Sequence, residues 1–142
     1  MIKLIDIYEE IIKGTDIEID NRHGVGAVPN NLDVNYLGFE TEMTPDEFLS
    51  LATPTDMEFK NVKNMWDLLQ SRGMGTPFLN VRWKGDFWQV EGHEGRHRME
   101  AIKRYGNPNA KIPVHIFPMG GMRARDITTN MKHAKFNSQR DL

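Results

Sequence analysis

Hydrophobic positions in the first half of the chain recur mainly every three or four residues, which is the spacing of amphipathic helices. This spacing predicts a helix over residues 2–13 that ends at Gly14, and another from Glu58 to Ser71 that ends at Gly73. The buried stripe of the second helix consists of Phe59, Val62, Met65, Trp66 and Leu69. Residues 20–35 are rich in glycine, asparagine and proline, and they predict a long loop.

A short helix is predicted by its capping residues, within the stretch MTPDEFLSLATP. Thr44 suits the N-cap, Pro45 suits the first helical position, and Glu47 completes a capping box. The helix should continue to about Ala52 and end before Pro54.

The pattern changes at residues 77–91, PFLNVRWKGDFWQVE, which are typical of a β-hairpin. Phe78 to Trp83 and Phe87 to Val90 are rich in aromatic and β-branched residues, and Lys84-Gly85-Asp86 supplies the turn. The strand character ends near Glu91, where a run of glycines and basic residues begins.

Three more elements are predicted after the hairpin. A helix from Arg96 to Tyr105 ends at Gly106, a strand follows from Lys111 to Phe117, and a last helix runs from Arg123 to Phe136 with a frayed tail. Helices and strands that alternate in one short chain indicate an α/β (α+β) fold.

Composition narrows the class of protein without defining the function. The chain has 142 residues, a formal net charge of -2 and no cysteine. The length suits one domain, and the charge argues against binding to nucleic acid through bulk charge alone. Without cysteine, disulfides, thiolate metal sites and cysteine nucleophiles are excluded. No signal peptide or membrane-spanning run is present, so we expect a cytoplasmic protein without a membrane partner.

The stretch VEGHEGRHRMEAIKRYG, residues 90–106, contains two overlapping motifs. One is HEGRH, residues 93–97, which fits the zinc-hydrolase pattern H-E-x-x-H, with Glu94 as general base between two histidines on one helix face. Gly92 precedes the first histidine after a run with strand character, and Gly95 costs about 1 kcal/mol in a helix relative to alanine. A zinc hydrolase is therefore the third hypothesis, and we expect no metal ligand.

The other motif is the basic glycine turn from Gly95 to Arg98. The N-terminus of the helix predicted after it presents unpaired N–H groups and the positive end of the dipole to an anion. Gly95 allows close approach of a phosphate, an exposed Arg98 offers a planar fork of donors, and Arg96 and His97 add charge. Glu94 and His97 are the candidate catalytic residues; Glu94 could act as a base or hold magnesium, or it could only cap or fix the loop. Spacing alone leaves open a solvated basic helix start that binds nothing.

Residues 95–101, G-R-H-R-M-E-A, resemble the G-x-H-R-x-E-A turn of the ParB/sulfiredoxin superfamily. The surrounding chain is similar to the superfamily's hairpin, nucleotide-binding turn, helix and return strand, in that order. The resemblance covers about residues 36–118 and implies a small mixed sheet with flanking helices. Residues 1–35 would then be an N-terminal helix and loop, and residues 119–142 a C-terminal helix and tail, of one single domain.

The resemblance also implies that the turn holds the phosphates of a nucleoside triphosphate, ATP or CTP, usually with magnesium. The positions that match the motif, Gly95, His97 and Arg98, are those that the resemblance assigns to phosphate contacts. We add Arg96 to this group because of its positive charge. Arg96 stands where sulfiredoxins have their catalytic cysteine, so repair of sulfinic acids is excluded. The chain after residue 118 is too short for a helix-turn-helix module, so a chromosome-partition ParB is disfavoured.

We therefore expect phosphoryl transfer, or hydrolysis of a nucleotide or phosphodiester, at residues 94–98. An enzyme, whether phosphotransferase, nucleotidase or nuclease, is favoured over a non-catalytic regulatory module that binds phosphate or nucleic acid. A nucleotide is the expected binding partner, and nucleic acid is a second candidate partner. The compact chain suits a phage or mobile-element protein, and the sequence does not define its oligomeric state.

Overall fold

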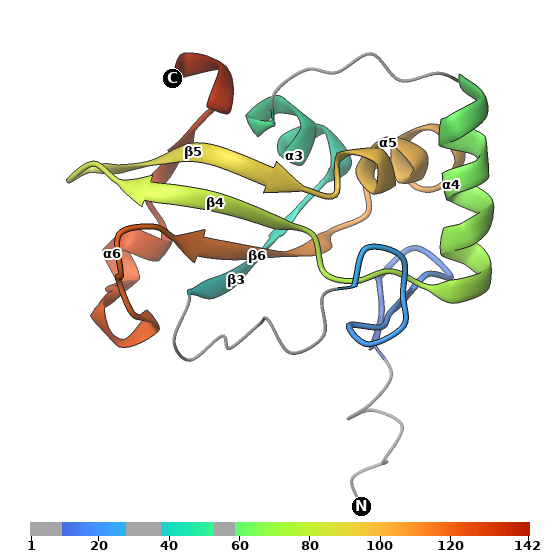
Figure 1. Cartoon of the computed structure of the whole chain (residues 1–142), viewed down its shortest axis with the longest axis horizontal. Coiled ribbons are helices and arrows are strands. Elements are labelled where there is room, and N and C mark those ends of the chain that lie inside the picture. The colour runs from blue at the N-terminus through green and yellow to red at the C-terminus, as the bar shows by residue number, and fades with distance from the viewer. Residues whose placement is uncertain (1–9, 28–37, 53–58) are drawn as a thin grey trace, which may run out of the picture.

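A five-stranded mixed sheet organises the chain, with its strands in the order β3-β6-β4-β5-β7 (Figure 1). The computed structural model describes residues 10–27, 38–52 and 59–142. The strands of the sheet are β3 (Phe39–Met43), β4 (Phe78–Trp83), β5 (Phe87–Glu94), β6 (Ile112–Pro118) and β7 (Lys135–Asn137). The sheet curls, and with its helices it forms one mixed α/β domain, which confirms the predicted class.

The predicted hairpin forms the middle of this sheet. β4 and β5 pair antiparallel, and the backbone N–H of Lys84 closes the turn by donating to the carbonyl of Phe87 over 3.0 Å. β5 continues to Glu94, beyond its predicted end near residue 91, with a register shift opposite Asn80 and Val81. β6 then returns parallel to β4 and antiparallel to β3. The added length of β5 determines where the next helix begins.

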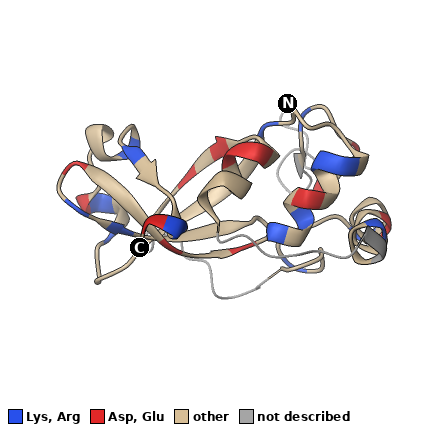
Figure 2. Cartoon of the chain, turned by 90° about the horizontal axis from the view of Figure 1, so that it is seen from above, with Lys and Arg blue, Asp and Glu red and all other residues tan. Residues whose placement is uncertain are grey.

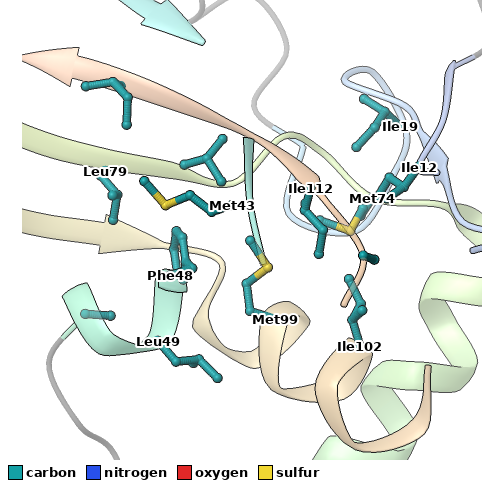
Figure 3. Packing of buried hydrophobic residues seen from close by; sticks show 14 of the residues in the cluster. Ile12, Ile19, Met43, Phe48, Leu49, Met74, Leu79, Met99, Ile102 and Ile112 are labelled. Carbon is teal, nitrogen blue, oxygen red and sulfur yellow. The ribbon is translucent and has the colours of Figure 1, made fainter. Parts of the chain in front are cut away.

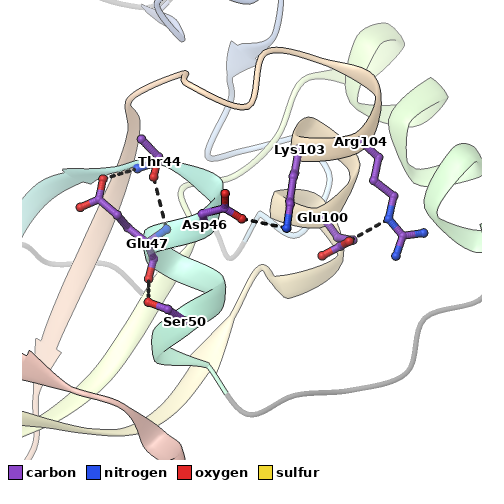
Figure 4. A network of polar contacts seen from close by, with 7 residues as sticks. All are labelled: Thr44, Asp46, Glu47, Ser50, Glu100, Lys103 and Arg104. Atoms are coloured by element: carbon purple, nitrogen blue, oxygen red, sulfur yellow. Dashed lines mark hydrogen bonds and ion pairs between the residues drawn. The ribbon is translucent and has the colours of Figure 1, made fainter.

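The described residues form four α-helices. They are α3 (Pro45–Leu51), α4 (Phe59–Arg72), α5 (Arg96–Tyr105) and α6 (Thr129–Lys132). α3 and α4 both pack against α5. The predicted capping box of α3 is confirmed: the Glu47 N–H donates to Thr44 Oγ1 over 3.2 Å, and the Thr44 N–H donates to Glu47 Oε1 over 3.1 Å (Figure 4). α5 has the predicted bounds, and α4 ends one residue later than expected.

The hydrophobic core lies between the sheet and the two helices α3 and α5 (Figure 3). Register brings Met43 of β3 opposite Ile112 of β6, and Phe48 and Met99 pack beside them from the helices. Each such side chain is fully or almost fully buried, and burial of one contributes about 1.5–3 kcal/mol. The core therefore holds α5 firmly against the sheet, and with it the turn that precedes the helix.

The N-terminal helix predicted over residues 2–13 is wrong where the structure describes it. β1 (Glu10–Ile11) pairs antiparallel with β2 (Glu18–Ile19), and residues 1–9 lie outside the described part of the chain. Ile11 is 61% exposed whereas Ile12 is buried, which is the alternation of a strand. Two adjacent isoleucines are also compatible with the hydrophobic face of a helix. The spacing of hydrophobic residues therefore could not distinguish a helix from a strand here.

The predicted loop over residues 20–35 is described up to residue 27, where it forms turns that pair with the segment after α4. The Asp20 N–H donates to the Met74 carbonyl over 2.8 Å, and the Val25 N–H donates to the Gly73 carbonyl over 3.0 Å. Asn21 exchanges two side-chain hydrogen bonds with Thr76. These bonds place residues 20–27 beside the start of β4, close to α5.

The last predicted helix, Arg123 to Phe136, is also wrong. This segment consists of η1 (Ala124–Asp126), the single turn of α6, and β7, which pairs parallel with β5; η2 (Gln139–Asp141) follows. The indole Nε1 of the buried Trp88 donates to the Met131 carbonyl, which fixes α6 against the sheet. The open edge of β5 therefore offers this segment backbone pairing that a continuous helix would leave unused.

Acidic and basic residues are spread over most elements of the fold (Figure 2). Opposite charges form surface pairs, such as Lys63 with Asp67 at 2.9 Å and Lys103 with Asp46 at 2.8 Å. Among the described residues, no helix has the length and hydrophobicity needed to cross a membrane.

Candidate functional site at the start of α5

The turn between β5 and α5 is a single residue, Gly95. Its φ of 121° and ψ of 9° lie in a region that L side chains rarely adopt, and a Cβ atom there would lie 2.7 Å from Pro77 Cβ. Gly95 is also the N-cap of α5, and no side chain in the described part of the structure caps this helix. The first N–H groups of α5, with the positive end of its dipole, are therefore left to solvent or a ligand.

A cavity of about 220 Å³ opens at this turn. It is lined by His93, Glu94, Gly95, Arg96 and His97. The structure thus brings together four of the five predicted site residues, and it adds His93, which the sequence suggested only as a zinc ligand. Arg98, the fifth, does not line the cavity.

Arg98 differs from the sequence expectation, because it is buried rather than exposed. It is only 2% exposed, and its Nη1 donates a hydrogen bond to the carbonyl of Gly75. Among the described residues its Nη2 donates no hydrogen bond, and it forms a long ion pair with Glu94 Oε1 at 3.8 Å. Burial lowers the pKa of Arg98, and the Glu94 carboxylate opposes that change. The guanidinium therefore has an unused donor beside two residues of the cavity wall, Glu94 and Gly95.

Two residues outside the predicted site hold the Arg98 side chain. A Cβ atom on Gly26 would lie 2.6 Å from Arg98 Cζ, so only glycine leaves room for the guanidinium there. Gly75 accepts the hydrogen bond from Arg98, and its own N–H donates to the carbonyl of Val25 over 2.9 Å. No local motif in the sequence indicates these contacts, since they join segments that are distant along the chain.

Arg96 is the cation that lines the cavity directly. Its Nε and Nη1 are buried, and neither has a hydrogen-bond partner among the described residues. Desolvation lowers the pKa of Arg96, Glu100 opposes this change, and the nearby positive charge of Arg140 adds to it. A partly desolvated guanidinium without a partner is costly, and an anion in the cavity would offset that cost.

Glu94 and His97, the predicted catalytic pair, are both exposed at the mouth of the cavity. The Glu94 side chain is 56% exposed, so it is accessible to a substrate or a cation. Glu91, which precedes them on β5, is instead occupied by a salt bridge with Arg82 over 3.2 Å. The carboxylate available for chemistry at the turn is therefore that of Glu94.

The zinc hypothesis loses its geometric basis. His93 belongs to strand β5, whereas His97 belongs to helix α5, so the two histidines do not share a helical face. His93 Nδ1 is 2.8 Å from Oε1 of Gln139, a residue of η2. Within the ranges that the structure describes, no group of three His, Cys, Asp or Glu side chains could hold a metal ion.

A larger cavity, of about 460 Å³, lies at the opposite end of the hairpin, between Trp83 and the loop after β6. Its arginine, Arg82, is paired with Glu91, and its wall includes the carboxylate of Asp126. No α-helix of the described residues begins at this cavity, and Arg82 is bound to Glu91 through its Nε. The α5 turn differs from this cavity in having the uncapped start of an α-helix in its wall.

The comparisons with known proteins add no relative: no family model, curated protein or solved structure matches the chain. The function is therefore inferred from the geometry and electrostatics of the α5 turn.

Proposed function

We propose that this protein binds the phosphate group of a nucleotide at the N-terminus of α5 and catalyses phosphoryl transfer or phosphate-ester hydrolysis there. The observation that carries the proposal is the coincidence, at one cavity, of an uncapped helix start and unused arginine donors. These are Nε and Nη1 of Arg96 beside the cavity and Nη2 of the buried Arg98 behind Gly95. The resemblance of residues 95–101 to the ParB/sulfiredoxin turn supports the same assignment.

Each residue of the turn has a distinct part in this proposal. Gly95 lets the phosphate approach the N–H groups of α5, and Arg96 neutralises its charge from the cavity wall. Glu94 accepts a proton from the attacking hydroxyl or water, while His97 donates to a phosphate oxygen. Positioning and neutralisation of charge account for most of the catalysis in reactions of this class.

Magnesium fits this site only as an ion that enters with the nucleotide. Mg²⁺ is usually held by one or two carboxylates together with substrate phosphates, and Glu94 is the carboxylate on the cavity wall. The ion would supply further neutralisation of the phosphate charge. The residues of the turn bind and orient the phosphate in either case.

Isothermal titration calorimetry of the whole chain with ATP, CTP and GTP, with and without magnesium, tests the binding. We expect one nucleotide to bind, and Arg96→Glu to abolish the heat of binding, because it places a carboxylate against the phosphate. Arg125→Ala is the matched control, since this arginine is exposed on η1 and lines neither cavity. Equal binding by Arg96→Glu and the wild type would show that the phosphate site lies elsewhere.

The catalytic part is tested separately, by phosphate release and by transfer to added acceptors. Glu94→Gln should retain binding and lose turnover, because the amide keeps the shape of the side chain but cannot accept the proton. A wild type that binds nucleotide but shows no turnover with any acceptor would favour the alternative, a non-catalytic phosphate-binding module.

A further inference from the structure

His93 lines the cavity at the start of α5, and one of its ring nitrogens is already bound. Its Nδ1 lies 2.8 Å from Oε1 of Gln139, a residue of η2. The turn η2 is itself fastened to β5, because Nε2 of the buried Gln89 donates to the carbonyl of Ser138 over 2.9 Å. The strand β7, which precedes η2, also pairs with β5. The fold therefore holds Gln139 beside His93.

This contact determines which nitrogen of the His93 ring carries the proton. An amide oxygen accepts hydrogen bonds and cannot donate one, so the bond to Gln139 Oε1 requires a proton on Nδ1. In the neutral imidazole the other nitrogen, Nε2, is then an acceptor. Nε2 forms no hydrogen bond among the described residues, and it is not one of the buried atoms that lack a partner, so a ligand can reach it.

An acceptor at Nε2 does not suit a bare phosphate. A fully ionised phosphate has no proton to donate, so its lone pairs and the lone pair of Nε2 repel each other. A hydroxyl next to the phosphate removes this repulsion, because it donates to Nε2 while the phosphate faces α5. Glu94 is the other acceptor of this cavity wall, and the proposed function assigns it to the attacking hydroxyl or water. The acceptor of His93 is therefore left for a hydroxyl of the ligand.

The size of the cavity indicates where that hydroxyl lies on the ligand. The volume of about 220 Å³ is below the range of about 300–1,000 Å³ that is usual for pockets enclosing a drug-sized ligand. The phosphate and the atoms closest to it should therefore enter, while the rest of the ligand stays outside. A hydroxyl that reaches His93 must then be close to the phosphate.

We propose that His93 is a specificity-determining residue, which selects phosphate esters that carry a free hydroxyl close to the phosphate, as sugar phosphates do. Gln139 is a positioning residue, because its amide oxygen sets the tautomer of His93. This inference rests on the proposed phosphate binding at α5, and it names a substrate class for that site: hydroxylated phosphate esters in preference to simple alkyl phosphates.

Titration calorimetry of the whole chain with glycerol phosphate and with propyl phosphate tests the selection, since these esters differ only in their hydroxyls. The wild type should bind glycerol phosphate about fivefold more tightly, the effect of one hydrogen bond. His93→Phe and Gln139→Met should bind both esters equally. Gln139→Glu should keep the preference, because a carboxylate also accepts from Nδ1–H. Arg125→Ala, outside the cavity, is the control and should keep it too.

Nitrogen-15 NMR of the imidazoles tests the tautomer without any ligand, in alkaline buffer where these rings are neutral. The spectrum of His93→Phe identifies the signals of His93. In the wild type the proton should be on Nδ1, and Gln139→Met should shift it towards Nε2, which a loss of packing alone would not do. A wild-type proton on Nε2 would overturn the inference, because the ring would then present a donor to the ligand.

The binding outcomes separate this inference from the proposed function. If the wild type binds both esters equally and Arg96→Glu binds neither, His93 makes no selection and the phosphate site at α5 stands. If the wild type binds neither ester and no nucleotide, the phosphate site is wrong and the inference is wrong with it. A preference for glycerol phosphate that persists in His93→Phe would also overturn the inference, since another residue would then recognise the hydroxyl.

Discussion

α3 and α5 begin in opposite ways, although both pack on the same core. The N-terminus of α3 is closed by its own side chains, Thr44 and Glu47, which satisfy backbone N–H groups in both directions (Figure 4). The N-terminus of α5 has only Gly95 as its N-cap, and two arginines, Arg96 and Arg98, lie beside it together with the carboxylate of Glu94. A chain that caps one helix fully leaves the other open at a cavity. This difference is the structural basis of the proposed ligand site at the open end.

The largest expected effect concerns Arg98. Arg98→Ala should lower the free energy of unfolding by about 3 kcal/mol, because it empties a buried space and leaves the Gly75 carbonyl without its donor. Arg98→Met should cost less than this, about 1–2 kcal/mol, because the methionine fills the space but also leaves the Gly75 carbonyl without its donor. Urea denaturation measures both, and both variants should lose nucleotide affinity.

If Arg98→Met retained full nucleotide affinity, Arg98 would be a structural residue only. The control is a second cation of α5: Lys103→Met removes a charge from the exposed side of this helix, where Lys103 pairs with Asp46 of α3. That variant should change neither stability nor affinity by an amount comparable to Arg98→Ala.

The next effect concerns the turn itself. Gly95→Ala should lower the free energy of unfolding by about 2 kcal/mol, because the added Cβ meets Pro77 in a backbone conformation that already disfavours it. Gly85→Ala is the matched control: its φ of 98° carries the same kind of strain, but nothing lies within 4 Å. The control should cost about 1 kcal/mol. Equal losses in the two variants would show that close packing at Gly95 is unimportant.

At α3 the expected loss is smaller and confined to stability. Thr44→Ala should cost about 1 kcal/mol, the usual effect of removing an N-cap side chain, and should leave nucleotide affinity unchanged. Ser50→Ala removes an exposed hydroxyl from the same helix without opening the cap and should be near neutral. Weaker nucleotide binding in Thr44→Ala would contradict the contrast between the two helix starts.

The smallest effect is a pH dependence of the closed cap. The N–H of Thr44 lowers the pKa of Glu47 from the ordinary value of 4.5, so the carboxylate stabilises the fold. This stabilisation is fully present above pH 4.5 and is lost as the pH falls through the lower pKa of the folded state. Thermal denaturation of wild type and Glu47→Gln should therefore differ at neutral pH and converge in acid. A difference that grew on acidification would contradict the assignment.

The elements that local signals define could be predicted from the sequence. The capping box of α3, the hairpin turn at Gly85 and the bounds of α5 depend on residues that are close together along the chain. β7 could not be predicted, because it forms only by pairing with the distant strand β5, and β1 could not be predicted because two adjacent isoleucines suit a helix as well as a strand. The short segment at Lys135–Asn137 has strand structure because the edge of β5 is available.

The candidate site likewise has one part that the local sequence predicts and another part that it does not. The cavity wall from Glu94 to His97 follows from a strand, a glycine and a helix in sequence order. The burial of Arg98 depends on Gly26 and Gly75, and the contact of Gln139 with His93 depends on the position of η2 beside β5. Neither has a signal in the local sequence, so an arginine at a predicted helix start was expected to be exposed.

The position of β3 in the sheet has a consequence for the rate and order of folding. β4 and β5 are joined by a tight turn, whereas β3 must find β6 across the whole of α3, α4, the hairpin and α5. Closing so long a loop costs entropy before any pairing is gained, so the hairpin should form before β3 docks. Substitutions in β3, such as Met43→Ala, should then mainly accelerate unfolding, while substitutions in the hairpin slow folding.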